Sequence, residues 1–153
     1  MIQYNIYGGI IMETDKIKHL EFLQANISRM NRCSFQMKGW TFAIVAALLA
    51  VFAASGGGKS NILFLLIAIL PTILFCMLDT YYLTKERYFV KIYNLVAGIE
   101  ESNVIIKPFD LNPKLPQNEK SKFIKTLVTA TELGLYGMII VFLIVLSTVI
   151  FFK

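Results

Sequence analysis

The chain has 153 residues, of which 56% are hydrophobic and 16% charged, with a formal net charge of +5. Soluble domains carry about 25% charged residues, and the mean hydropathy of this chain is +0.62. This composition excludes a disordered chain and argues against a monomeric soluble enzyme, while the length allows one domain. The sequence therefore predicts an integral membrane protein.

The N-terminal part of the chain contains an amphipathic pattern. Residues 1–15 give no clear structural signal, and we expect them to be disordered or to contain a mis-annotated start, in which case the true start is Met12. From residue 16 to residue 38, apolar side chains recur at steps of three and four, as one face of a helix requires. No proline separates this pattern from the apolar stretch that follows, so one long helix is predicted.

Three apolar stretches are long enough, with their flanks, to cross a membrane: about 40–55, about 62–83 and the last within residues 126–153. A hydrocarbon core of about 30 Å needs about 20 helical residues, and in lipid a helix satisfies every backbone group within one segment. The predicted fold is therefore all-α, with three transmembrane helices.

The connections between these stretches define the predicted organisation. The glycine-rich segment at 56–61 is a tight turn, so residues 16–101 are expected to form a long antiparallel hairpin with cytoplasmic extensions. Pro71 should kink its second span. Residues 102–125 are rich in proline and asparagine and are expected to form a cytoplasmic loop before the third span.

The basic residues predict an orientation. Of the fifteen Lys and Arg residues, five precede the first span and eight lie between the second and third. Such residues collect on the cytoplasmic side of a membrane. We therefore expect a multi-pass protein of the inner (plasma) membrane, with the N-terminus in the cytoplasm and the C-terminus outside. The positive charge is interpreted as an orientation signal, and nucleic acid is not an expected partner.

The hairpin should bring charged residues together at the inner boundary of the membrane. An ionisable group at the edge of hydrocarbon is costly unless it is paired. We therefore expect an ion pair between Lys38 and Asp79, and a second pair between Glu86 and either Arg29 or Arg32. The same pairs could form between subunits, and Lys38 could instead reach the lipid headgroups with its long side chain.

Small residues gather on the first and third spans, where they let helices approach closely. They could pack within one chain, but three helices offer limited internal surface, so a homo-oligomer is expected. The candidate packing residues are Ala43, Ala46, Ala47, Ala50, Ala54, Gly134 and Gly137.

Motifs that could carry chemistry are weak. GGGKS at 56–60 has Ala53 where a phosphate-binding loop needs glycine, and it follows an apolar helix rather than a strand. Cys33 and Cys76 lack a metal-ligand spacing and are expected to pack as small apolar residues. His19 is the only histidine. We therefore expect no catalytic, cofactor-binding or metal residues, and no enzyme activity.

Two segments carry a family resemblance: KHLEFLQANISRMNRCSFQMKGW at 18–40 and LDTYYLTKERYFVKIY at 78–93. Framing a two-span hairpin, they resemble the SLATT-like small multi-helix membrane effectors of bacterial antiviral conflict systems. The resemblance implies a homo-oligomeric effector that permeabilises or disrupts the inner membrane. It also implies a switch, either a soluble cytoplasmic sensor or a partner that makes a nucleotide signal.

Two other functions remain open from the residues themselves. The segments outside the spans could make the chain a membrane anchor or scaffold that recruits a soluble partner protein. Alternatively, the chain could be a small channel or transporter subunit, although such a subunit would need more polar groups inside the spans than this sequence offers.

Overall fold

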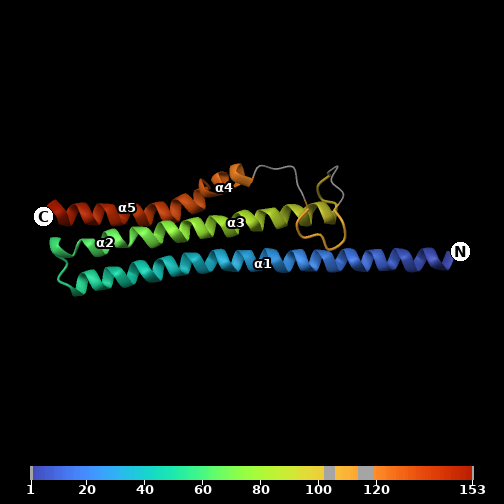
Figure 1. Ribbon diagram of the computed structural model, residues 1–153, viewed down its shortest axis with the longest axis horizontal. Coiled ribbons are helices and arrows are strands. Elements are labelled where there is room, and N and C mark those ends of the chain that lie inside the picture. The colour runs from blue at the N-terminus through green and yellow to red at the C-terminus, as the bar shows by residue number, and fades with distance from the viewer. Residues whose placement is uncertain (1, 102–105, 114–118, 153) are drawn as a thin grey trace. The chain divides into compact units, whose positions relative to one another are not determined.

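The computed structural model describes residues 2–101, 106–113 and 119–152, and every regular element among them is helical. In chain order these are α1 (Ile2–Ala54), the 3-10 helix η1 (Lys59–Asn61), α2 (Leu63–Ile67), α3 (Ile69–Ala97), α4 (Glu119–Leu127) and α5 (Ala130–Phe152) (Figure 1). Three helical stretches are long and apolar enough to cross a membrane. Because α1 and α3 also pack closely, as in a hairpin, the predicted all-α fold is confirmed.

Helix α1 is continuous over 53 residues. The expectation that residues 1–15 are disordered is not met, because α1 extends back to Ile2. No proline interrupts the run, and a nucleated helix gains one hydrogen bond for each residue that it adds. Gly39, the weakest point before the apolar part, stays helical. The polar start and apolar end therefore belong to one element, as predicted.

Glycines end α1 and start the turn of the hairpin. Gly56 has a φ of 92° and Gly57 a φ of 61°, a left-handed region that costs other residues a steric penalty. The Gly57 N–H donates to the Phe52 carbonyl and the Gly56 N–H to the Ala53 carbonyl, both at 3.2 Å. These two bonds form a Schellman cap, so the GGGKS segment serves as a helix end and turn.

The kink predicted at Pro71 takes the form of a break between α2 and α3. Pro71 lies in the first turn of α3, where proline is tolerated. Its ring would crowd the carbonyl four residues earlier, on Ile67, and α2 ends at that residue. Ala68 keeps a φ of −65° and a ψ of −21°, so the helix resumes at once.

Helix α3 ends earlier than the apolar pattern suggested. We expected the hairpin helix to continue to about residue 101, but α3 stops at Ala97. Gly98 follows with a φ of 80°, and the Ile99 N–H donates to the Asn94 carbonyl at 2.9 Å. This is a second glycine-based helix cap, and its conformation overrides the apolar periodicity.

The segment expected to be a loop, 102–125, is only partly so. Residues 102–105 and 114–118 lie outside the described residues, and residues 106–113 form turns. Helix α4 occupies Glu119–Leu127 and α5 begins at Ala130. The loop prediction is therefore wrong over 119–125, because no proline lies beyond residue 116 to prevent a helix there.

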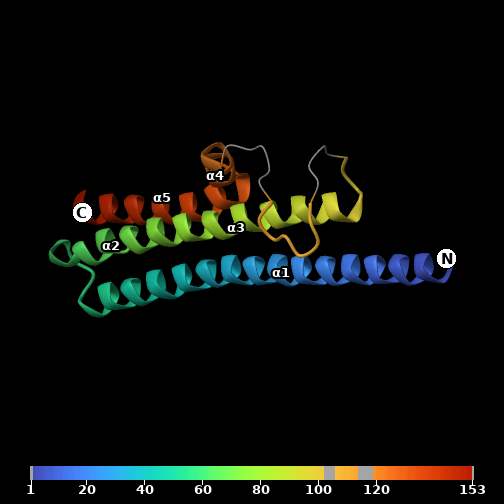
Figure 2. The ribbon, with the colours of Figure 1, turned by 45° about the vertical axis from the view of Figure 1, so that its right-hand side comes forward.

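The chain divides into two compact units. The first contains Met1–Asn31 and Lys85–Asn118, and the second contains Arg32–Thr84 and Glu119–Lys153. Within the second unit, α5 runs alongside α3 and ends near the turn between α1 and α2 (Figure 1 and Figure 2). Its direction is therefore opposite to that of α3, as three crossings of one membrane require.

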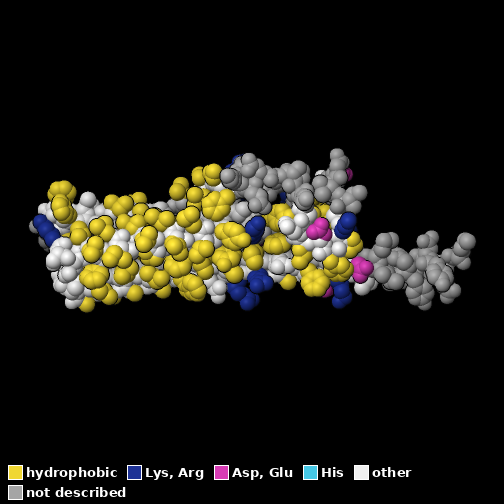
Figure 3. Space-filling view, viewed as in Figure 1, with side chains coloured by type: hydrophobic (Ala, Val, Ile, Leu, Met, Phe, Trp, Pro, Cys, Tyr) yellow, Lys and Arg dark blue, Asp and Glu magenta, His cyan; other side chains and the backbone are white. Residues whose placement is uncertain are grey.

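The second unit is apolar on the outside. Its core is small and centres on Val45, Ala68 and Leu143. Large hydrophobic side chains stay outside, with Leu70 and Met138 each 71% exposed. In Figure 3 such side chains cover the α1, α3 and α5 stretches of this unit. Contiguous apolar surface of this extent indicates a lipid environment, so the chain has the features of a small multi-pass membrane protein.

Candidate functional site

A group of polar side chains joins α1, α3 and α5 near the start of the apolar part of α1. Lys38 Nζ donates to Asp79 Oδ2, to Glu132 Oε1 at 3.0 Å and to Ser34 Oγ at 3.1 Å. The Tyr136 hydroxyl donates to Asp79 Oδ2 at 2.8 Å. We call these five residues the Lys38 cluster. It ties all three long helices together with charge-assisted hydrogen bonds, which are stronger than neutral ones.

Four of the five residues in the Lys38 cluster are buried, and Lys38 itself is partly exposed. The side chains of Asp79 and Glu132 are 0% exposed, while that of Lys38 is 21% exposed. The single ammonium group of Lys38 therefore forms ion pairs with two buried carboxyl groups. Asp79 Oδ1 and Glu132 Oε2 are buried without a hydrogen-bond partner. Removing the cation would leave both carboxyl groups stranded in an apolar interior, which is strongly unfavourable.

Local helix geometry explains how the sequence builds this cluster. Ser34 and Lys38 lie four residues apart on α1, as do Glu132 and Tyr136 on α5, and this spacing puts each pair on one face. Glu132 also lies in the first turn of α5, where the helix dipole favours an acidic group. These faces of α1 and α5 both contact Asp79 of α3.

The structure brings Lys38 and Asp79 together, in the contact anticipated from the hairpin. Sequence reasoning missed Ser34, Glu132 and Tyr136 as members of the same group. One signal could have identified Glu132: it precedes twenty uncharged residues, and an acidic residue at the end of a span usually faces the protein interior. Its partner could not be inferred, because the docking of α5 is not set by the hairpin.

The second anticipated ion pair is not present. Among the described residues, no ion pair within 4.0 Å involves Arg29, Arg32 or Glu86. Arg29 and Arg32 are both exposed, and Glu86 instead accepts a long hydrogen bond of 3.5 Å from Asn31 Nδ2. Asn31, rather than either arginine, is therefore the α1 side chain that reaches this carboxylate. The two arginines stay on the outside of their helix.

The predicted packing face of α1 points away from the core of the second unit. All five of its alanines (43, 46, 47, 50 and 54) are exposed, whereas Thr41, Val45 and Phe52 are the residues of this stretch that are buried. The alanines therefore do not mediate the helix packing within the chain. They form a smooth stripe of small side chains on the outer surface.

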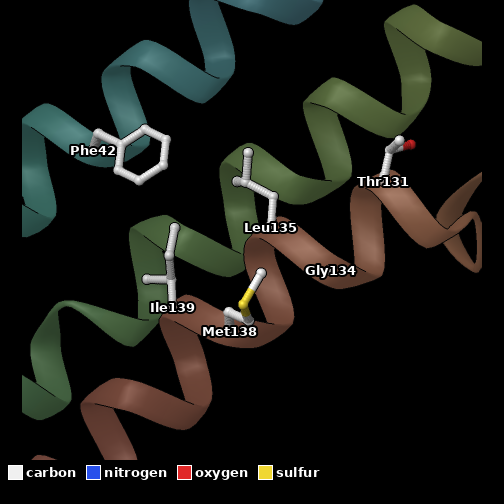
Figure 4. A pocket seen from close by; sticks show the side chains of 6 residues that line it. All are labelled: Phe42, Thr131, Gly134, Leu135, Met138 and Ile139. Carbon is white, nitrogen blue, oxygen red and sulfur yellow. The ribbon is translucent and has the colours of Figure 1, made fainter.

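The glycines of α5 are not close-packed either. A Cβ atom added at Gly134 or Gly137 would meet nothing within 4 Å. Gly134 lies in an open groove of about 520 Å³ beside Phe42, Thr131, Leu135, Met138 and Ile139. Figure 4 shows Phe42 on α1 facing the side chains of α5 across this groove. With a largely apolar lining, it continues the outer apolar surface and offers little to a polar ligand.

Three other polar side chains of the spans are also turned inward. Thr41, Thr72 and Ser147 are buried. Their hydroxyl groups donate to the carbonyls four residues earlier, on Met37, Ala68 and Leu143, each at 2.8 Å. Bonding of this kind satisfies a hydroxyl within its own helix. These three hydroxyl groups therefore need no partner from a neighbouring helix.

The first unit has a contact site of its own. Phe109, with a φ of 61°, places its ring 6.0 Å from His19 and 6.1 Å from Phe22 of α1. The Tyr88 hydroxyl of α3 donates to the Pro113 carbonyl at 2.7 Å. The segment 106–113 therefore contacts both helices, and together with the polar parts of α1 and α3 it forms a folded structure.

The two cysteines are not paired with each other. Cys33 and Cys76 are free, half-buried thiols. Among residues 2–101, 106–113 and 119–152, no group of three or more His, Cys, Asp or Glu side chains is placed to hold a metal ion. Comparison of the chain with family models, curated proteins and solved structures found no match.

Proposed function

We propose that this protein is a homo-oligomeric effector that permeabilises the inner membrane as part of a bacterial antiviral defence system. A soluble cytoplasmic sensor or nucleotide-signal partner would switch it. The observation that carries the proposal is the exposed alanine stripe of α1. Five small side chains on the outer surface, unused within the chain, offer the close backbone approach by which membrane helices associate.

The arrangement of polar groups bears on how such an effector would act. In the described part of the second unit, the charged cluster and three span hydroxyls face inward, whereas large apolar side chains make up most of the outer surface of the spans. Subunits that associate through this surface would enclose an apolar space or lipid, and a hydrophobic constriction stays closed until it is wetted. We propose that the resting state is closed and that the switch rearranges the helices.

The expected orientation completes the proposal. On the basis of the positive-inside rule, we propose that the first unit lies in the cytoplasm, where a partner or signal can reach it. A reporter enzyme fused after Lys153 should be active only outside the cytoplasm. Activity of that reporter inside would contradict the orientation without affecting the fold.

The decisive experiment measures release of a trapped dye from vesicles that contain the purified protein, alongside its mass in detergent. We expect an oligomer and dye release. Ala47→Leu combined with Ala50→Leu should reduce both, because the added branches keep the helices apart. Leu74→Phe adds bulk at a residue of α3 that is 54% exposed and serves as the matched control. A monomer with no leak, under all conditions and with cell extract added, would reject the proposal.

A second function, a membrane anchor for a soluble protein, is favoured by a separate observation. The polar parts of α1 and α3 form a compact unit with the docked segment 106–113, and a fold of this kind can present a specific surface. An inert protein that co-purifies with one soluble partner would support the anchor. Replacing Phe109 with alanine should then weaken the partnership more than it changes membrane insertion.

A further inference from the structure

The outer face of α1 carries an ordered series of side chains beyond the alanine stripe. Because α1 is continuous, Arg29, Arg32, Gln36 and Trp40 follow at steps of three and four and share one side of the helix. All four are exposed. Two cations thus lie about 12 to 17 Å along the helix from an aromatic ring, on the side that leads into the alanines.

The tryptophan and the arginines of this series suit different depths of a bilayer surface. Trp40 is 55% exposed. Its ring makes an edge contact with the ring of Phe75 on α3, and the two ring centroids are 6.1 Å apart. Amphipathic rings favour the boundary between hydrocarbon and headgroups. Headgroup layers add about 5 to 8 Å on each side of the hydrocarbon core, and arginine side chains are long enough to bend back into that layer.

The charges of Arg29 and Arg32 are not neutralised by any residue that the structure describes. Neither arginine forms an ion pair with another described residue, and Glu86 accepts its bond from Asn31. Guanidinium groups match the geometry of phosphate oxygens with paired hydrogen bonds. Two guanidinium groups one helical turn apart, about 12 to 17 Å along the helix from Trp40, therefore form a complement to an anionic headgroup.

We propose that Arg29 and Arg32 bind the phosphate of an anionic phospholipid at the membrane surface, next to Trp40. An acidic soluble protein is the less suitable occupant, because the same face continues without a break into the apolar surface. This site lies beyond the alanine stripe, so it stands or falls independently of the proposed function. Basic residues near the headgroups should enrich anionic lipid on the order of tenfold around this face.

Trp40 makes the proposal directly measurable, because it is the only tryptophan in the chain. The full-length protein would be placed in phosphatidylcholine vesicles that contain a minor fraction of brominated phosphatidylglycerol, whose bromines quench tryptophan fluorescence on contact. The mirror experiment uses the same minor fraction of brominated phosphatidylcholine in unlabelled phosphatidylcholine. We expect brominated phosphatidylglycerol to quench Trp40 severalfold more strongly, and salt near 1 M, with a Debye length of about 3 Å, to reduce the difference.

Two variants identify the residues responsible. Arg29→Gln with Arg32→Gln should bring the quenching by the two brominated lipids to equality. Lys16→Gln with Lys18→Gln removes the same charge from exposed positions of α1 about 33 Å or more from Trp40, and should leave the preference intact. Circular dichroism verifies that both variants remain helical. Equal quenching in the unmodified protein, or a preference that survives loss of both arginines, would overturn the proposal; so would displacement of the lipid preference by a soluble acidic peptide.

Discussion

Within the second unit, the side chains of Asp79 and Glu132 are 0% exposed, while Leu70 and Met138 on the outside are each 71% exposed. A soluble domain of this size distributes such groups in the opposite way. The difference is explained if lipid surrounds the unit, because apolar side chains then need no cover and polar groups must find partners inside. In such a protein the hydrophobic effect does not hold helices together, so contacts such as the Lys38 cluster and close packing must do so.

The largest effect is expected when the positive charge of Lys38 is removed from the buried cluster. Lys38→Met should destabilise the fold by about 3–5 kcal/mol, because it leaves two buried carboxyl groups without a counter-charge. Thermal or denaturant unfolding in detergent, followed by circular dichroism, provides the measurement. Lys59→Met, which removes the same charge from the exposed turn, should change stability little.

A double-mutant cycle tests whether Lys38 and Asp79 stabilise the fold through their contact. Asp79→Ala should also be destabilising, and Lys38→Ala with Asp79→Ala together should cost less than the sum of the single changes, because the pair interacts. The same unfolding assay is used for all three variants. Strictly additive costs would mean that the contact contributes no stability.

An intermediate effect is expected for the tyrosine of the cluster. Tyr136→Phe keeps the ring but removes the hydroxyl that donates to Asp79 at 2.8 Å, and should cost about 1–2 kcal/mol. Tyr82→Phe, in a half-buried position of α3, serves as the control in the same unfolding experiment. Equal effects at the two positions would indicate that the buried hydroxyl adds nothing.

The smallest effect is expected on the outside of α5. Gly134→Ala places a methyl group where nothing lies within 4 Å, and it should stabilise the monomer by about 0.5–1 kcal/mol through helix propensity. Stability measured at high detergent, where subunits separate, isolates the monomer. A loss of stability there would show that α5 packs more closely than the structure indicates.

The amino-acid sequence was a reliable guide to the continuity of the first helix and to the turn of the hairpin. The continuity of α1 from its polar part into its apolar part follows from the absence of proline, the reversal at Gly56 and Gly57 from their freedom at positive φ, and the break before α3 from Pro71. The Lys38–Asp79 contact was accessible because a tight turn defines the register of a hairpin. Where the prediction missed a local signal, as at Gly98, apolar periodicity was allowed to outweigh a helix cap.

The sequence by itself determined that three apolar helices form and that the first pairs with the second. Only the tertiary structure decided that Glu132 and Tyr136 join Lys38, that Asn31 rather than an arginine meets Glu86, and that the alanines of α1 stay outside. The physical reason is that periodicity and turn residues act over a few neighbours along the chain. The rotation of each helix about its axis, by contrast, depends on side chains that meet from distant parts of the chain.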